Sequence, residues 1–309
     1  DALPILPYVT KPDTIVPGVA NYYASTFIKG GDYCSILVKT REGRPIKIEG
    51  NSLSPITKGG TSARVQASVL DLYDTNRYQS PMQVTAGKTK PINWSELDQA
   101  VMAKLVSATG IRILSNTILS PTAKKAIGEF LSKYPSAKWV SYDPVSASGL
   151  LDANQACFGE RLVPSYSFDK AKVIVGFNCD FLGTWISPIE YAGQYAQNRK
   201  IDGVTGAKMS RHYQVESHMS LTGSNADNRI LVKPSEQGAA IANLYNAIAS
   251  QLGASSINAP KLNEKASKAL KDVAKDLVAN KGASLVVSGS NNKFEQILVN
   301  KINDLLNEK

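Results

Sequence analysis

The sequence predicts an α/β protein in which a small, β-rich amino-terminal domain precedes a larger, doubly wound α/β domain. A strand–turn–strand pattern in residues 33–49 predicts the first domain. From residue 93 onward, short apolar runs alternate with longer segments of helical periodicity, which predicts the second domain. Parallel strands need crossover connections, which are normally helices, so this alternation favours a parallel sheet covered on both faces.

The amino-terminal region is expected to form an extended arm, a hairpin and a short helix. Residues 1–23 contain four prolines and no periodicity, which favours an arm that lies on another surface. Strands at 33–40 and 45–49 flank a tight turn, in which Gly43 supplies a positive φ. Residues 63–73 then show helical periodicity. The side chains on the apolar side of that helix are Val65, Val69, Leu70 and Leu72.

A polar linker at 83–91 is expected to separate this region from the larger domain. Asn93 and Glu96 form a capping box for the first helix that follows. Ser120 and Pro121 start the next helix as its N-cap and its first helical residue. One face of the first helix carries Trp94, Leu97, Val101 and Leu105, and the expected buried face of the second carries Ile127, Phe130 and Leu131.

The remaining elements alternate along the chain. Strands are expected at 111–115, where the strand is buried, and at 138–142, 172–177, 208–215, 229–232 and 284–288. Helices are expected at 147–158, 188–197, 235–252, 263–279 and 293–306. Ser290 or Asn291 is expected to cap the last helix.

Composition excludes several classes of protein. With 43% hydrophobic and 20% charged residues among 309, the chain is globular rather than disordered or fibrous. No apolar run approaches the roughly 20 residues that a membrane-spanning helix needs. The 35 Lys and Arg residues exceed the 26 Asp and Glu residues by nine, but they are spread along the chain without a basic recognition helix. Nucleic acid is therefore not an expected partner.

The usual fingerprints of phosphate and metal sites are absent from the sequence. No G-x-G-x-x-G follows a strand, and the glycines at 203–208 have the wrong spacing for a P-loop. The loop 59–62 could offer backbone N–H groups to an anion, although a flexible loop entry is the favoured interpretation. His212 and His218 lie on one side of an expected strand around Glu216. A structural role is favoured there, because a metal would need a further ligand.

Three isolated cysteines, Cys34, Cys157 and Cys179, form no disulfide framework and no C-x-x-C motif. Cys179 follows the expected strand at 172–177, a position where ligands often gather. A lone buried cysteine usually acts as a small hydrophobic residue, and that interpretation is favoured here.

The amino-terminal hairpin resembles a known domain. The run CSILVKTREGRPIKIEGN at 34–51, followed by PITKGG at 55–60 and by Leu72-Tyr73-Asp74, is similar to the amino-terminal domain of the complex iron–sulfur molybdoenzymes. In those enzymes three closely spaced cysteines precede the hairpin and a fourth follows the loop. Cys34 matches the third, while the other positions hold no cysteine, and a four-iron four-sulfur cluster needs four thiolates in most proteins. The resemblance therefore implies that this cluster is absent.

A second set of segments narrows the resemblance. They are VPSY at 163–166, DFLGTWISP at 180–188 and SLTGSNADNR at 220–229. They are similar to the molybdoenzyme-like half of the B subunit of alternative complex III, a bacterial quinol-oxidising respiratory assembly, and subunits of polysulfide-reductase type are the nearest competitor. The resemblance implies an arm and a degenerate iron–sulfur-type domain at 1–82. It also implies a doubly wound, molybdopterin-oxidoreductase-like α/β domain of molybdoenzyme type at 83–309, incomplete at its carboxyl end.

The same resemblance implies a cofactor-free scaffold that is not itself catalytic and has no catalytic, cofactor-binding or metal-binding residues. Iron–sulfur clusters and c-type haems are expected elsewhere in the complex. The implied partners are the ferredoxin-like iron–sulfur half of the same subunit, a multihaem cytochrome c subunit and quinol-binding integral membrane subunits. The implied location is the periplasmic side of the bacterial inner membrane, as a peripheral part of a membrane complex.

Two alternatives stay open. An active molybdopterin-dependent oxidoreductase would hold a two-pterin cofactor at the switch point of the sheet, near Asn178-Cys179-Asp180, with Cys179 as a metal ligand. A stand-alone nucleotide-binding protein would rest on the α/β pattern alone, which is an argument from fold and not from a site.

Overall fold

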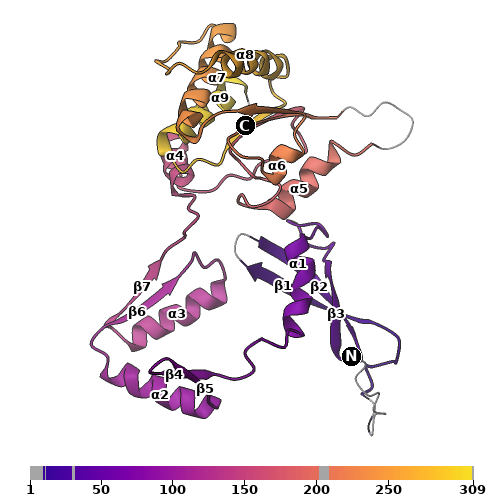
Figure 1. The fold of residues 1–309 in the computed structure, drawn as a ribbon, viewed down its shortest axis with the longest axis vertical. Helices are drawn as coiled ribbons and strands as arrows, with labels where there is room; N and C mark the ends of the chain where they lie inside the picture. The colour runs from indigo at the N-terminus through magenta and orange to yellow at the C-terminus, as the bar shows by residue number, and fades with distance from the viewer. Residues whose placement is uncertain (1–9, 11, 30–31, 202–208, 308–309) are drawn as a thin grey trace. The chain divides into compact units, whose positions relative to one another are not determined.

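The computed structural model describes residues 10, 12–29, 32–201 and 209–307. The chain forms two compact units (Figure 1). The larger unit consists of Asp1–Asp71 and Ala147–Lys309, and the smaller unit consists of Leu72–Ser146. The division of the chain at residue 82, which follows the family resemblance, stays a prediction.

A three-stranded antiparallel sheet opens the larger unit, in the order β1-β2-β3. The strands are β1 (Asn21–Lys29), β2 (Asp32–Arg41) and β3 (Arg44–Gly50). The predicted hairpin is confirmed, and its turn residues Glu42 and Gly43 have φ values of 50° and 76°, as a tight two-residue turn requires. Strand β1 was not predicted, because most of its side chains are exposed and its pairing with β2 is made by the backbone. The expected arm therefore ends at residue 20, and its residues 1–9 and 11 lie outside the described part of the chain.

The helix expected at 63–73 is interrupted. It begins as α1 (Ala63–Ala67) and continues as the 3₁₀ helix η1 (Ser68–Leu72). The hydroxyl of Ser68 donates to the carbonyl oxygen of Val65 at 2.7 Å, a local bond that ends the α-helix. Of the four side chains expected on the apolar face, only Val65 is buried, while Leu70 and Leu72 are exposed.

A four-stranded parallel sheet forms the centre of the larger unit, in the order β10-β9-β8-β11. Its strands are β8 (Val173–Phe177), β9 (Arg211–Glu216), β10 (Asn228–Leu231) and β11 (Ser284–Ser288). The chain runs outward from β8 to β10 and then returns to place β11 on the other side of β8. This reversal confirms the doubly wound α/β prediction and places the topological switch point between β8 and β11.

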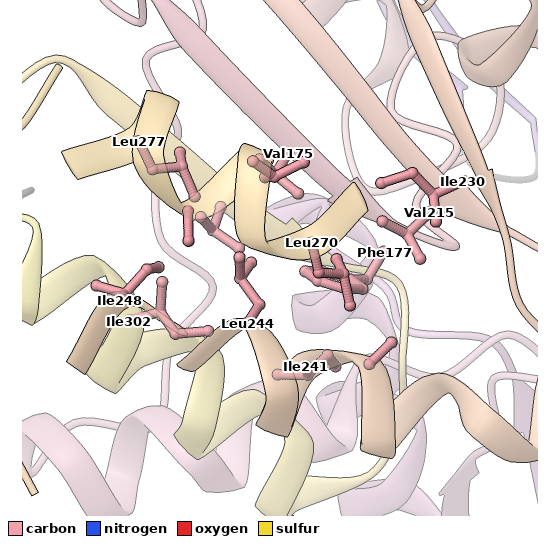
Figure 2. Close-up of a cluster of buried hydrophobic side chains, with 14 of the residues drawn as sticks. Val175, Phe177, Val215, Ile230, Ile241, Leu244, Ile248, Leu270, Leu277 and Ile302 are labelled. Atoms are coloured by element: carbon pink, nitrogen blue, oxygen red, sulfur yellow. The ribbon is translucent and has the colours of Figure 1, made fainter. Parts of the chain in front are cut away.

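Helices cover both faces of this sheet (Figure 1). The helices of the larger unit are α4 (Ser148–Phe158), α5 (Pro188–Gln197), α6 (Leu221–Ser224), α7 (Gln237–Leu252), α8 (Glu264–Ala279) and α9 (Lys293–Leu305), with a short 3₁₀ turn η2 (Pro234–Glu236) before α7. Val175 and Phe177 of β8 point into a core made with α7, α8 and α9, where Leu244, Leu270 and Ile302 meet them (Figure 2). Ile174 of the same strand points to the opposite face, into a second core.

The predicted bounds of these elements agree with the structure within a few residues. The cap of α9 is an exception. Asn292, and not Ser290 or Asn291, is the N-cap, and its Oδ1 accepts from the Phe294 N–H at 2.9 Å. Ser290 instead accepts from the Asn292 N–H at 3.1 Å, so it shapes the loop before the helix.

The smaller unit contains six elements. They are β4 (Met82–Thr85), β5 (Lys88–Pro91), α2 (Trp94–Ser107), β6 (Ile111–Ser115), α3 (Pro121–Lys133) and β7 (Ala137–Ser141). The capping box at Asn93 and Glu96 is confirmed, as is the start of α3 at Ser120 and Pro121.

Three predictions about the smaller unit are wrong. The segment 83–91 is not a linker but belongs to the β4-β5 hairpin, turned by Ala86 and Gly87 with φ values of 48° and 76°. Its strands are mostly exposed and polar, so no apolar alternation marks them in the sequence. The strand at 111–115 is only half-buried, and the expected apolar faces of α2 and α3 hold no buried residue.

Candidate functional site

Cys34 lies in β2 and is fully buried. Its thiol donates to the carbonyl oxygen of Gly60 at 3.2 Å, and it packs with Ile36, Val65 and Ile189. Burial raises the pKa of the Cys34 thiol. The sulfur is therefore a neutral thiol that already has a protein partner.

An iron–sulfur cluster does not fit these residues. Four thiolates hold such a cluster in most proteins, and Cys34 is the one cysteine in residues 1–82. Within the described parts of the chain, no three or more His, Cys, Asp or Glu side chains gather where they could hold a metal ion. A degenerate cluster domain therefore stays the prediction for this region.

An ion pair between Asp32 and Arg64 lies beside Cys34. Asp32 is 1% exposed, and Arg64 donates to it through Nε at 2.5 Å and Nη2 at 2.9 Å. The same Nη2 donates to the carbonyl oxygen of Gly183 at 2.8 Å, in the loop after β8. Arg64 therefore binds Asp32 through a bidentate, charge-assisted pair and ties the amino-terminal sheet to the loop after β8 through one bond to Gly183.

A cleft of about 410 Å³ lies beside this ion pair. Its charged lining residues are Lys29, Asp32, Arg64 and Asp71. Lys29 lies 3.6 Å from Asp71, and Arg64 is paired with Asp32, so the charges of the lining cancel. The cleft offers no excess charge that would attract an ionic ligand.

The loops that follow β8 and β11 contact each other at the switch point between these strands. The Gly289 N–H, just after β11, donates to the carbonyl oxygen of Phe177 at 3.0 Å. A Cβ at position 289 would overlap the carbonyl oxygen of Asn178, so the two loops touch backbone to backbone. In doubly wound sheets this crevice is where ligands normally bind.

Cys179 points away from that crevice. It is fully buried in the second core of the sheet, where Phe168, Ile174 and Tyr191 surround it. Burial raises the pKa of the Cys179 thiol. Because its sulfur lies among these apolar side chains, Cys179 is not placed to ligate a metal in the crevice. The residues at the switch point therefore do not fit a metal-bearing pterin.

A row of buried polar side chains runs along β9 on the face opposite the main core. His212, Gln214 and Glu216 are each fully buried, and their alternate positions place them on one face of the strand. His212 Nε2 lies 3.3 Å from Gln214 Oε1, and Gln214 Nε2 donates to Glu216 Oε2 at 3.3 Å and to the carbonyl oxygen of Cys179 at 3.1 Å. At the other end, His212 Nδ1 lies 3.2 Å from the hydroxyl of Tyr195.

Glu216 carries a fully buried carboxylate that accepts from three donors besides Gln214. Arg229 Nε donates to Oε1 at 2.8 Å, and the Ser220 hydroxyl donates to Oε2 at 2.7 Å. The Ser220 N–H adds a bond of 3.2 Å to Oε1. Gly223 leaves the room for this carboxylate, because a Cβ there would overlap Oε1. These contacts supply the pairing without which a buried charge is destabilising.

Asp180 joins the two segments that carry the family resemblance. Its Oδ1 accepts from the Thr222 hydroxyl at 2.8 Å and from the Thr222 N–H at 3.0 Å. Thr222 Oγ1 in turn accepts from the Leu182 N–H at 2.9 Å. The loop at 180–188 and the turn at 220–229 are therefore bonded to each other, and their polar groups serve that bond.

The structure separates the two histidines of the sequence. His212 belongs to the buried row, whereas His218 is exposed beyond the end of β9, so they do not form a metal pair. In the loop 59–62, Gly60 holds Cys34 and Ser62 caps α1, while the glycines at 203–208 lie outside the described residues. The sequence reasoning missed Gln214 and Tyr195. Polar residues at every second position of a strand could have indicated the row.

The remaining chemistry of the row is limited. Burial lowers the pKa of His212 to about 4, and both ring nitrogens have protein partners. The backbone N–H of His212 donates to Asp227, which Arg199 also binds at 2.8 Å. The side chains of the row thus bond to one another, and the bond from Gln214 to Cys179 holds the loop after β8 against β9.

Comparisons with known proteins agree with the fold. Over 212 residues the chain is 24% identical to the "menaquinone reductase, molybdopterin-binding-like subunit" of Nitratidesulfovibrio vulgaris, covering 66% of this chain and 29% of that protein. A 77-residue match, 26% identical, covers 24% of this chain and 11% of the "probable oxidoreductase YoaE" of Bacillus subtilis. The solved structure of acetylene hydratase from Pelobacter acetylenicus matches 86% of this chain and 37% of that one, at 13% identity and a TM-score of 0.50.

No protein-family model matches the sequence. The chain spans less than a third of the length of the curated relatives it matches, 29% of one and 11% of the other. It is a distant homologue of molybdopterin oxidoreductase-like proteins, and the structural match confirms the predicted fold class. Among the described helices, none combines the length and the apolar character that crossing a bilayer requires.

The pH dependence of stability tests the buried row. The pKa of His212 is about 4 in the folded chain, below the ordinary value of 6.5, so the unfolded chain binds more protons between these values. We expect the free energy of unfolding to fall by up to about 3 kcal/mol between pH 7 and 4.5. In His212→Gln this fall should be smaller, whereas His218→Gln, the matched exposed control, should keep it. Urea unfolding at each pH measures this. If the free energy of unfolding falls equally with pH in both variants, His212 is not a neutral, buried group in the folded chain.

The contact at the switch point is tested by adding one methyl group. Gly289→Ala should destabilise the chain by about 1–3 kcal/mol, because the new Cβ must displace the Asn178 carbonyl. Gly193→Ala in α5, where nothing lies within 4 Å of the added Cβ, should be neutral or stabilising by up to about 1 kcal/mol. Thermal unfolding of both variants checks this, and a Gly289→Ala protein as stable as the parent would mean that the crevice is open.

Proposed function

We propose that residues 1–309 are a cofactor-free scaffold region of a molybdopterin-binding-like subunit in a membrane-bound respiratory quinone oxidoreductase. The curated relative is named as such a subunit of a menaquinone reductase. Alternative complex III, to which the segments at 180–188 and 220–229 are similar, is the assembly type that we favour. In that setting the chain lies on the periplasmic side of the inner membrane.

One observation carries this proposal. At both places where a chain of this fold would hold a redox group, the chain's own atoms make the contacts. Cys34 donates to Gly60, and Gly289 touches Asn178 across the switch point. A region that holds no redox group can still position its neighbours, because electron transfer between cluster-bearing and haem-bearing subunits depends on how they are held.

The proposed partners follow from this role. A ferredoxin-like iron–sulfur half of the same subunit, a multihaem cytochrome c and quinol-binding membrane subunits would carry the clusters, the haems and the quinol. The chain itself would contribute rigid packing. The doubly wound sheet, and the Arg64–Gly183 bond that joins the amino-terminal sheet to it, give it the rigidity that such packing needs.

An active molybdopterin-dependent oxidoreductase is the second candidate, because the sheet has the switch-point topology that such enzymes use. It requires Cys179 or a neighbour to reach a metal. The burial of that thiol in an apolar core argues against it.

The metal content of the native assembly tests the proposal. The assembly is purified from its host through a tag on the complete subunit, with Cys34→Ala in one strain and Cys157→Ala, at an exposed cysteine, in the control strain. We expect equal iron and molybdenum per assembly, equal EPR spectra and equal quinone-linked activity in both strains. If Cys34 ligates a cluster, Cys34→Ala should lose about four iron atoms and one EPR signal.

A further inference from the structure

The second core of the larger unit contains a chain of aromatic rings. The ring centroids of Trp185 and Tyr191 lie 5.8 Å apart, and those of Tyr191 and Phe168 lie 4.9 Å apart. Phe168 stacks on Phe181 with a centroid distance of 4.3 Å, and Phe181 meets Tyr195 edge-on at 5.7 Å. The contacts thus run without a break from the half-buried Trp185 to the buried Tyr195 in α5.

Tyr195 differs from the other tyrosines of this core because a base lies beside it. Its hydroxyl is 3.2 Å from His212 Nδ1, and both side chains are buried. The chain has one other histidine, His218, which is exposed beyond β9. Among the described residues, Tyr195 is therefore the tyrosine of this core that has an imidazole within hydrogen-bond distance.

The bonds of Gln214 decide which nitrogen of His212 carries the hydrogen. Gln214 Nε2 donates to the carbonyl oxygen of Cys179 at 3.1 Å and to the Glu216 carboxylate at 3.3 Å, and neither of these groups can donate. Gln214 Oε1 therefore faces His212 Nε2, at 3.3 Å, and accepts a hydrogen from it. Because burial lowers the pKa of His212 to about 4, the ring is neutral at pH 7 and its Nδ1 carries no hydrogen.

The phenolic hydrogen of Tyr195 thus has two acceptors within reach. They are His212 Nδ1 at 3.2 Å and the carbonyl oxygen of Asn225 at 3.1 Å. Of these two, the bare Nδ1 is the group that can take up the proton. After such a transfer the new N–H points back at the phenolic oxygen, and both ring nitrogens donate to a partner.

The surroundings keep this proton on the phenol as long as the phenol is reduced. Burial raises the pKa of Tyr195 to about 12, far above that of the imidazole. Asp227 is bound by Arg199 and Glu216 by Arg229, so the nearby carboxylates are balanced by guanidinium groups and do not draw a proton onto the ring. Removal of an electron reverses the order, because an oxidised phenol is a far stronger acid than an imidazolium.

We propose that Tyr195 and His212 form a proton-coupled redox site, which an oxygen-derived radical oxidises by way of Trp185. The radical gains one electron and becomes an anion, and the electron lost by Tyr195 replaces it along the aromatic chain. The proton of Tyr195 Oη moves to His212 Nδ1, which leaves a neutral tyrosyl radical beside an imidazolium. One electron from a thiolate reductant then restores the phenol, which takes its proton back from Nδ1. This inference does not depend on the proposed respiratory role.

Photo-oxidation of the complete gene product tests the proposal. Flash-excited tris(bipyridyl)ruthenium with persulfate is the one-electron oxidant, and EPR spectroscopy of frozen samples detects the radicals. We expect a tyrosyl signal that outlives the radicals of exposed tyrosines, and Tyr195→Phe should lose it. Tyr245→Phe is the matched control and should keep the signal, because the Tyr245 hydroxyl donates to the carbonyl oxygen of Ser255 and to no base. No long-lived signal in the parent, or equal signals in the two variants, overturns the proposal.

A second variant separates the redox role of His212 from a role in packing. His212→Gln keeps the phenol and removes the base, so the long-lived radical should form at least about tenfold more slowly. In the parent, formation should also be slower in heavy water. An unchanged rate in His212→Gln or in heavy water contradicts the proposed proton transfer.

A third measurement needs no substitution. Electron–nuclear double resonance on the parent protein with isotopically labelled histidine should detect an imidazole nitrogen coupled to the tyrosyl radical. A radical without this coupling lies at another tyrosine and overturns the proposal.

Discussion

The buried carboxylate of Glu216 is the constraint on which the carboxyl edge of the parallel sheet depends. A fully buried charge is stable only when it is paired and hydrogen-bonded. Arg229 from β10 and Ser220 from the cap of α6 meet this need, and Gln214 extends it along β9 to His212 and to the carbonyl oxygen of Cys179. The loop after β8 is thereby held in place by Gln214, whose side-chain amide bonds both Glu216 and the carbonyl oxygen of Cys179.

This arrangement has a direct consequence for function. Sheets that bind nucleotides or pterins leave backbone and side-chain donors free at the ends of their strands. Here Thr222 donates to Asp180, the Leu182 N–H donates to Thr222, and Gly289 lies against Asn178. The same edge that would take a cofactor has become internal structure, which is the physical basis of the scaffold role that we propose.

Much of the fold follows from sequence patterns. Apolar runs located β8 and β11, because burial on both sides leaves a clear mark in the sequence, and capping residues located the starts of α2 and α3. Strand β1 and the β4-β5 hairpin were missed, since their pairing is made by backbone atoms of exposed strands. At the site, Cys34 and Cys179 could be singled out from the sequence. Their partners Gly60 and Gln214 could not, because those contacts form only when distant segments pack.

The apolar face of α3 was predicted to be buried and is not, and the apolar face of α2 holds no buried residue either. Periodicity reports that a helix has an apolar face, and it says nothing of whether the covering layer lies within the same stretch of sequence.

A high-resolution electron-microscopy map of the assembly isolated from its host tests the central claim most directly, namely that the cofactor positions are filled by the chain itself. The account predicts Cys34 in hydrogen-bond contact with Gly60, and the backbones at Asn178 and Gly289 in contact with each other. Density for an iron–sulfur cluster at Cys34, or for a pterin separating the two loops, would contradict it.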